Sequence, residues 1–142
     1  MAGAIDACVK ADIPVMGHIG LTPQSVHATG GFKVQRDGDQ LLKDAKAVEA
    51  AGAFAVVIES VPEPLAAAVS AALSIPTIGI GASAACDGQV LVLHDMLGLY
   101  PDFRPKFAKQ FAPLADAVTT AVRQYWKEVK SGQFPGPEHT FK

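Results

Sequence analysis

The sequence has few cysteines, little net charge and no long hydrophobic run. Its 142 residues include two cysteines, Cys8 and Cys86, whose spacing excludes a CxxC motif and indicates reduced packing thiols in a cytoplasmic protein. A net charge of −2 gives no basic surface for nucleic acid or for an acidic membrane. The apolar runs are too short to span a membrane, and no signal-peptide pattern opens the chain. We therefore expect neither nucleic acid nor a membrane as a partner.

The abundant residues indicate one class of fold. Hydrophobic residues make up 49% of the chain and charged residues 18%, which is typical of a globular protein. Apolar runs at 13–17, 54–58, 76–80 and 89–93 predict strands, and they alternate with helical patterns at 2–10, at 40–51 and after Pro62. Continuous apolar strands separated by helices are typical of a parallel sheet with helices on both faces. The pattern predicts an α/β protein.

The last third of the chain has a different character. Residues 101–105 form a linker, and residues 106–111 and 114–130 have the apolar spacing of helices before a tail rich in proline and glycine. We therefore divide the chain into a β/α region at 1–100 and C-terminal helices with a tail at 101–142.

A polar group follows each predicted strand. These groups are His18, Glu59, a glycine-containing loop after Ile80, and the pair His94 and Asp95. In a (β/α)₈ barrel the carboxyl ends of the strands form one active-site mouth, so half a barrel would bring these groups together. A free-standing doubly wound sheet is the alternative, but the sequence has no GxGxxG after its first strand.

Glu59 and His18 are the strongest candidates, and each has two interpretations. Glu59 follows an apolar run, where a carboxylate shielded from water could act as a general base, or it could pair with a lysine or cap the next helix. His18 could contact a substrate, or it could be a structural histidine at a strand end.

Other polar groups give weaker signals. The carboxylates at the presumed mouth, Glu59, Asp87 and Asp95, and the histidines His94 and His139 lack the clustering of a metal site, so we assign no metal ligand in this chain. Thr22, Gln24 and Ser25 could hold a polar ligand or cap the loop, and Gly79, Gly81 and Gly88 could let backbone amides approach an anion or form a tight turn. Lys33 could neutralise a carboxylate or phosphate, or it could be an exposed surface lysine. Tyr125 and Trp126 indicate helix packing or a subunit contact rather than a platform for ligand stacking.

Five ordered motifs and the tail resemble one enzyme family. The motifs are PVMGHIGLTPQS at 14–25, GFKVQ at 31–35, VIESVP at 57–62, IPTIGIGA at 75–82 and DGQVLVLHD at 87–95, with FPGPEHTF at 134–141. Together they resemble the ketopantoate hydroxymethyltransferase family over nearly the whole chain, but only over the second half of the family's length. The resemblance implies the C-terminal half of a (β/α)₈ TIM barrel of the phosphoenolpyruvate/pyruvate type.

The resemblance also implies a reaction and its participants. The family transfers a hydroxymethyl group from 5,10-methylenetetrahydrofolate to 3-methyl-2-oxobutanoate, giving 2-dehydropantoate for pantothenate synthesis, with Mg²⁺ holding the 2-oxo acid. Glu59 matches the family's proton acceptor, and His18 matches a histidine that lines the same pocket. The family forms homo-oligomers, usually decamers. Its magnesium ligands and substrate-binding lysine belong to the half that this sequence does not match.

Two local departures and the unmatched half affect what the chain is expected to do alone. Arg36 and Asp37 replace the family's Gly-Arg, and Ser83 replaces a glycine. We expect the isolated chain to be inactive unless an N-terminal half or oligomerisation completes it. The alternatives are a non-catalytic remnant that mediates assembly, or another 2-oxo-acid lyase or mutase of the same superfamily.

Overall fold

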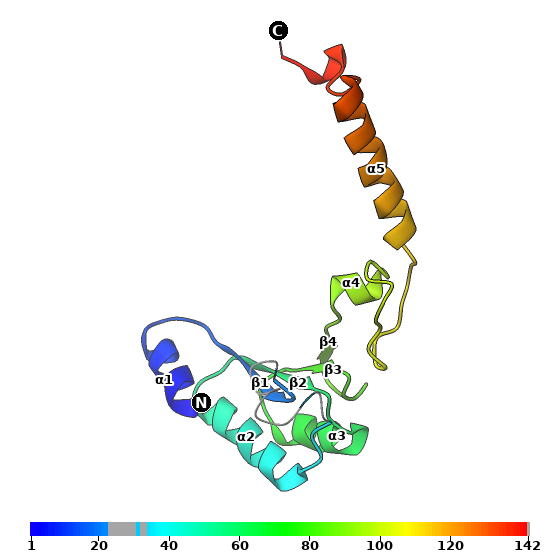
Figure 1. Ribbon diagram of the computed structural model, residues 1–142. Helices are drawn as coiled ribbons and strands as arrows, with labels where there is room; N and C mark the ends of the chain where they lie inside the picture. Colours follow the sequence, from blue (N-terminus) through cyan, green and yellow to red (C-terminus); the bar gives the residue numbers. More distant parts are fainter. Residues whose placement is uncertain (23–30, 32–33, 142) are drawn as a thin grey trace. The chain divides into compact units, whose positions relative to one another are not determined.

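The computed structural model describes residues 1–22, 31 and 34–141, which form two compact units, Met1–Val90 and Leu91–Lys142 (Figure 1). We call them unit 1 and unit 2. The candidate residues Gln24, Ser25 and Lys33 lie outside the described residues. No helix in the described part of the chain is long and apolar enough to cross a membrane.

Unit 1 alternates helices and strands, as the sequence predicts. Its described strands are β1 (Met16–Gly20), β2 (Ala55–Glu59), β3 (Thr77–Ile80) and β4 (Gly88–Gln89), and its described helices are α1 (Ala2–Lys10), α2 (Gly38–Ala50) and α3 (Glu63–Ala72). The strands form one parallel sheet in the order β1-β2-β3-β4. The predicted α/β class with a parallel sheet is therefore confirmed.

Local chemistry explains where α2 and α3 begin. The Asp37 carboxylate accepts a hydrogen bond from the Gln40 amide at 3.0 Å and so caps the start of α2. This cap gives a structural role to Asp37, one of the three residues that depart from the family pattern. Pro64 lies in the first turn of α3, where the missing N–H would have had no helical partner in any case.

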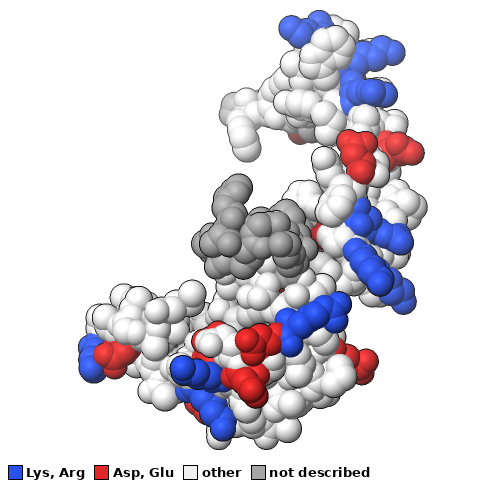
Figure 2. Space-filling view, turned by 60° about the horizontal axis from the view of Figure 1, so that its bottom comes forward, with Lys and Arg blue, Asp and Glu red and all other residues white. Residues whose placement is uncertain are grey.

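Helix α2 is amphipathic, with one apolar side and one charged side. Leu41, Ala45 and Val48 are buried at a spacing of three and four residues. Lys43 and Asp44 lie on the exposed side. Figure 2 shows basic and acidic side chains next to one another on the surface of the molecule.

One face of the sheet is buried under α2 and α3 (Figure 1). Val56, Ile58 and Thr77 on this face are fully enclosed. Val48 of α2 lies so close to β1 that a side chain at Gly17 would collide with it. The hydrophobic core of unit 1 therefore lies between this face and the two helices.

The opposite face of the sheet is only half-buried. The parallel register places Val57 beside His18 and Ile78, and Glu59 beside Ile80, so these five residues share what we call the open face. Their side chains are partly exposed, whereas the residues that alternate with them in the strands are buried. Since α2 and α3 lie on the other face, the expected cover of helices on both faces is wrong for the described part of the chain.

The connection from β3 to β4 contains no helix. Residues 81–87 return the chain to the amino end of β3, where the Thr77 amide and hydroxyl donate hydrogen bonds to Asp87 Oδ2 at 2.8 and 2.9 Å. The amide bond, which has the larger effect, and the hydroxyl bond hold the pKa of Asp87 below its ordinary value. Asp87 therefore lies at the amino end of the strands, and its expected place at the mouth is wrong.

The fourth strand is shorter than predicted. β4 ends at Gln89, because β3 ends at Ile80 and offers little backbone for further pairing. The Val90 amide makes one more bond to the sheet, donating to Gly79 O at 3.0 Å. The predicted fourth strand is therefore present, but its predicted extent of 89–93 is wrong: the strand ends at Gln89, and a helix begins at Leu93.

Unit 2 contains α4 (Leu93–Met96), α5 (Ala115–Ser131) and a 3₁₀ helix, η2 (Pro137–His139), among its described residues. α5 confirms the helix predicted at 114–130. The helix predicted at 106–111 is wrong, because backbone groups there make other bonds. The Phe111 amide donates to Met96 O at 2.7 Å, and the Ala108 amide closes a turn on Pro105 O at 3.0 Å.

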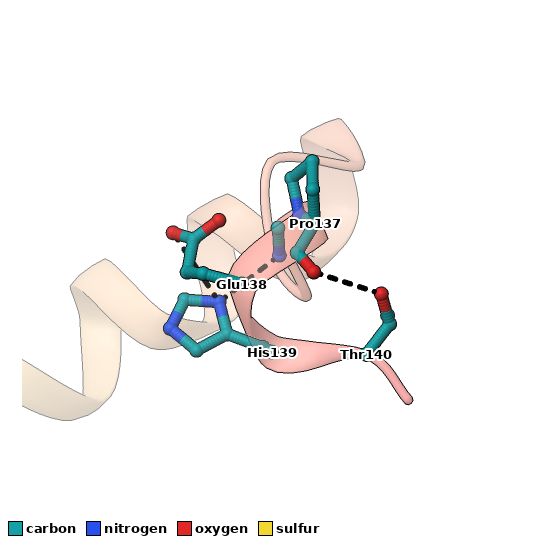
Figure 3. Close-up of polar contacts among 5 residues, drawn as sticks. Pro137, Glu138, His139 and Thr140 are labelled. Carbon is teal, nitrogen blue, oxygen red and sulfur yellow. Dashed lines mark hydrogen bonds and ion pairs between the residues drawn. The ribbon is translucent and has the colours of Figure 1, made fainter. Parts of the chain in front are cut away.

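The tail of unit 2 folds back onto α5. The Phe134 ring meets the Tyr125 ring edge to face, with centroids 5.5 Å apart, and the His139 ring lies 5.2 Å from Phe134. The Gly136 amide donates to His139 Nδ1 at 3.1 Å, which closes the turn of η2 (Figure 3). Tyr125 and His139 therefore have packing roles within the described tail.

Candidate functional site

The structure brings His18 and Glu59 together on the open face. Glu59 is the last residue of β2, and its register partner in β1 is Gly20, two residues after His18. The Nε2 atom of His18 lies 3.0 Å from Oε2 of Glu59, within ion-pair distance. The sequence predicts both residues at strand ends, with the first strand at 13–17. The structure confirms this for Glu59, but β1 runs from Met16 to Gly20, so the predicted strand end at His18 is wrong and His18 lies in the middle of β1, beside Glu59.

This pair is partly shielded from water. The side chain of Glu59 is 18% exposed and that of His18 is 35% exposed. The Nε2 atom of His18 is itself buried, and no described residue makes a hydrogen bond to it, because Nε2 and Oε2 are close but not aligned for one. Contacts of this kind in ligand-free sites tighten when the reacting complex forms. The pair thus places a partly shielded carboxylate beside an imidazole.

The backbone at Glu59 is fixed by both neighbouring strands. The Leu21 amide donates to Glu59 O at 2.9 Å, and the Ser60 amide donates to Ile80 O at 3.0 Å. Ser60 has φ of 53°, an uncommon value for a residue other than glycine, so the chain turns sharply directly after Glu59. Gly20 has φ of 87°, and a side chain there would collide with the Glu59 carbonyl oxygen. Rigid elements therefore hold Glu59 in place.

A cleft of about 370 Å³ lies beside β1, within the size range of small-molecule sites. Its lining comes from α1, β1 and α2 and includes His18, Gly20, Thr22 and Asp44. β1 is the first strand in the sheet order, so its outer edge pairs with no strand among the described residues. This side of the sheet therefore offers both a cleft and an unpaired strand edge.

The loop after β3 is fixed by its own hydrogen bonds. Ser83 is buried, its hydroxyl accepts a bond from the Ala85 amide at 3.0 Å, and its carbonyl accepts one from Gln89 Nε2 at 2.8 Å. Cys86 is also buried, and its sulfur accepts a hydrogen bond from the Ser70 hydroxyl at 3.6 Å. Ser83 and Cys86 therefore have structural roles in this loop.

The described residues do not form a metal centre. No group of three or more His, Cys, Asp and Glu side chains in this part of the chain is arranged to bind a metal ion. His94 and Asp95 lie in α4, so their predicted place at the end of a fourth strand is wrong. Mg²⁺ prefers an octahedral set of oxygen ligands, and the single carboxylate at the pair does not fit that requirement alone.

Gly20 and Ser60 are site residues that sequence reasoning did not single out. A glycine in a strand often marks a place where another backbone segment approaches closely. Gly20, the last residue of β1, could have been predicted on that basis. Ser60 gives no such sign, because serine does not favour a left-handed backbone; its amide donates to Ile80 O and its carbonyl accepts from the Gln35 amide, each at 3.0 Å.

Comparison with known proteins gives one consistent result. A model of the family described as ketopantoate hydroxymethyltransferase matches residues 1–137. A 3-methyl-2-oxobutanoate hydroxymethyltransferase of Enterococcus faecalis is 62% identical over 97% of this chain and 52% of its own length. The proteins of the same name from Trichlorobacter lovleyi and Pelobacter propionicus are 60% and 56% identical, each over 99% of this chain and 54% of its own length. The chain spans about half the length of the curated relatives it matches.

Proposed function

The chain belongs to the ketopantoate hydroxymethyltransferase family, and we propose that it supplies the proton-accepting half of a (β/α)₈ barrel enzyme of that family. The reaction transfers a hydroxymethyl group from 5,10-methylenetetrahydrofolate to 3-methyl-2-oxobutanoate and gives 2-dehydropantoate. The observation that carries the proposal is the shielded Glu59 carboxylate at the end of β2, beside His18.

The chemistry of the reaction requires a base at this kind of position. Carbon 3 of 3-methyl-2-oxobutanoate carries one hydrogen, which must leave as a proton before that carbon can attack the one-carbon unit. In our proposal Glu59 accepts this proton, and the electrons of the broken C–H bond form the new carbon–carbon bond. Water supplies the hydroxyl oxygen, and both carbon–nitrogen bonds of the one-carbon unit break. The two nitrogens of the departing tetrahydrofolate take up the proton from Glu59 and one proton from water. A carboxylate on a rigid strand end is suited to this step.

The open face supports the proposal that a second half is needed. In a β/α barrel, helices cover the outside of the strands and the inward face packs against the other strands of the barrel. Here α2 and α3 cover one face, and the opposite face carries half-buried Val57, Ile78 and Ile80 beside Glu59. We propose that an N-terminal half pairs with the edge of β1 and covers this face. We expect it to bring the ligands for Mg²⁺, and the completed barrel to form homo-oligomers.

A chimeric enzyme tests this proposal. The N-terminal half of the Enterococcus faecalis relative, joined to this chain, should form 2-dehydropantoate, whereas the isolated chain should form none. Glu59→Gln keeps the size of the side chain but removes the base, and it should lower the chimera's turnover by at least about 100-fold. Gel filtration and circular dichroism of both chimeras show whether the variant remains folded. Product formation by the isolated chain, or full activity of Glu59→Gln, would contradict the proposal.

A second candidate is a non-catalytic protein that mediates assembly. One observation favours it: α5 has no buried residue, and it exposes Val118, Val122, Tyr125 and Trp126. Apolar helix faces of this kind are covered by partners in assembled proteins. The Glu59→Gln chimera separates the two candidates, because an assembly protein would not depend on that carboxylate.

A further inference from the structure

We propose that His18 is a positioning residue that acts through Glu59 rather than by contacting the substrate, an inference that rests on the proposed function. It goes beyond a general role in lining the pocket, because it assigns His18 a specific partner atom. The carrying observation is the 3.0 Å separation of His18 Nε2 and Glu59 Oε2 on adjacent strands of one sheet face.

The backbone directs the His18 side chain toward the open face, next to the end of β2. His18 lies in the middle of β1, where its register partner is Val57 and where Gly17 and Ile19 on either side are buried. The strand therefore fixes the imidazole over the open face, beside the end of β2. Because β1 and β2 pair along five consecutive residues, the spacing of the two side chains is set by the sheet and not by a loop.

The Nε2 atom of His18 lies close to Glu59 but makes no aligned hydrogen bond with it. It is buried and receives no hydrogen bond from the described residues, although a carboxylate oxygen lies at bonding distance. A buried polar atom without a partner is costly, so there is a driving force to align the pair. A small rotation of the Glu59 side chain would point Oε2 along the N–H bond without any backbone movement.

Alignment has a chemical consequence for proton transfer. When Nε2–H donates to Oε2, the other carboxylate oxygen, Oε1, remains free to face the substrate carbon. The carboxylate is then held in one orientation instead of rotating about its last torsion. A misplacement of about 1 Å at a reacting group costs on the order of 100-fold in rate. His18 therefore contributes by orientation, and the C–H bond is still broken by Glu59.

Two variants of His18 test the positioning role in the chimera described above. His18→Asn shortens the side chain and removes the donor near Oε2, so the turnover number should fall by about 10- to 100-fold with little change in KM for the 2-oxo acid. His18→Gln places an amide N–H close to the original Nε2 and should restore most of that loss. The control is Met16→Leu, a conservative change on the same strand and face, which should leave turnover within about twofold.

A double-variant comparison separates positioning from direct substrate contact. If His18 acts through Glu59, His18→Asn should cause less than a twofold further loss in a chimera that already carries Glu59→Gln. If His18 contacts the substrate itself, the two losses should multiply and KM should rise, and the inference would be wrong. An inactive Glu59→Gln chimera together with a fully active His18→Asn chimera would overturn this inference alone. A fully active Glu59→Gln chimera would instead overturn the proposed function.

Discussion

Replacing Gly20 with alanine should destabilise unit 1 through two separable effects. Gly20 has φ of 87°, and a left-handed backbone costs an L-residue roughly 1–2 kcal/mol. The new Cβ would also collide with the Glu59 carbonyl oxygen and lie 2.9 Å from Val61 Cγ2, and overpacking of this kind costs about 1–3 kcal/mol. The expected loss of unfolding free energy is therefore about 2–5 kcal/mol, which is large for a small domain.

Two other glycines of unit 1 serve as controls for these effects. Gly52 has φ of 90°, and the nearest atom to an added Cβ is the movable end of Val9 at 3.0 Å, so Gly52→Ala should cost mainly the backbone part, about 1–2 kcal/mol. Gly3 lies in α1 with no atom within 4 Å, so Gly3→Ala should stabilise by about 0.5–1 kcal/mol. Urea unfolding followed by circular dichroism measures all three. Equal losses at Gly20 and Gly52 would refute the collision with Glu59.

Two further predictions concern Asp87 and Phe134. Because the Thr77 amide and hydroxyl lower the pKa of Asp87 in the folded chain, its carboxylate stabilises the fold above about pH 4, and this contribution disappears as pH falls through the lowered value. The drop in urea midpoint from pH 7 to pH 3 should therefore be smaller in Asp87→Asn than in the parent chain, and an equal drop would contradict the account. Phe134→Ala removes the edge-to-face contact with Tyr125, worth about 0.5–1.5 kcal/mol beyond its area. Hydrogen exchange should rise in residues 136–141 and stay unchanged in β2, whereas unchanged exchange throughout would refute the packing role of Phe134.

The sequence predicts those helices and strands whose apolar residues follow a regular spacing and whose end is marked by a polar residue or a glycine. β2 is an apolar run that ends at Glu59, and α2 has its apolar side chains at helical spacing before Gly52. The predicted extent of the strand at 89–93 was wrong for a reason that local pattern does not contain. The length of β4 depends on where β3 ends, and Ile80 ends it early. Likewise, Phe111 forms no helix because its amide bonds to Met96, far away in sequence.

The candidate site could be predicted in part for the same reason. A predicted position at a strand end singled out Glu59 and His18, because the carboxyl ends of parallel strands share one edge; the structure keeps Glu59 there but extends β1 two residues beyond His18. Their contact at 3.0 Å depends on the register between β1 and β2, which no residue in either strand specifies alone. For Asp87 the local pattern was misleading. Its place next to a glycine-containing loop predicted a position at the carboxyl ends of the strands. Its hydrogen bonds with Thr77 instead place it at the amino ends.

Exchange of the carbon 3 hydrogen of 3-methyl-2-oxobutanoate tests the role of Glu59 most directly. In heavy water the chimera should exchange this hydrogen for deuterium without any folate, because proton removal precedes one-carbon transfer in the proposed reaction. Nuclear magnetic resonance of the 2-oxo acid follows the exchange, with Mg²⁺ present throughout. Rapid exchange by the parent chimera and at least about 100-fold slower exchange by Glu59→Gln is the predicted result. Equal exchange rates for the two chimeras would show that Glu59 is not the proton acceptor.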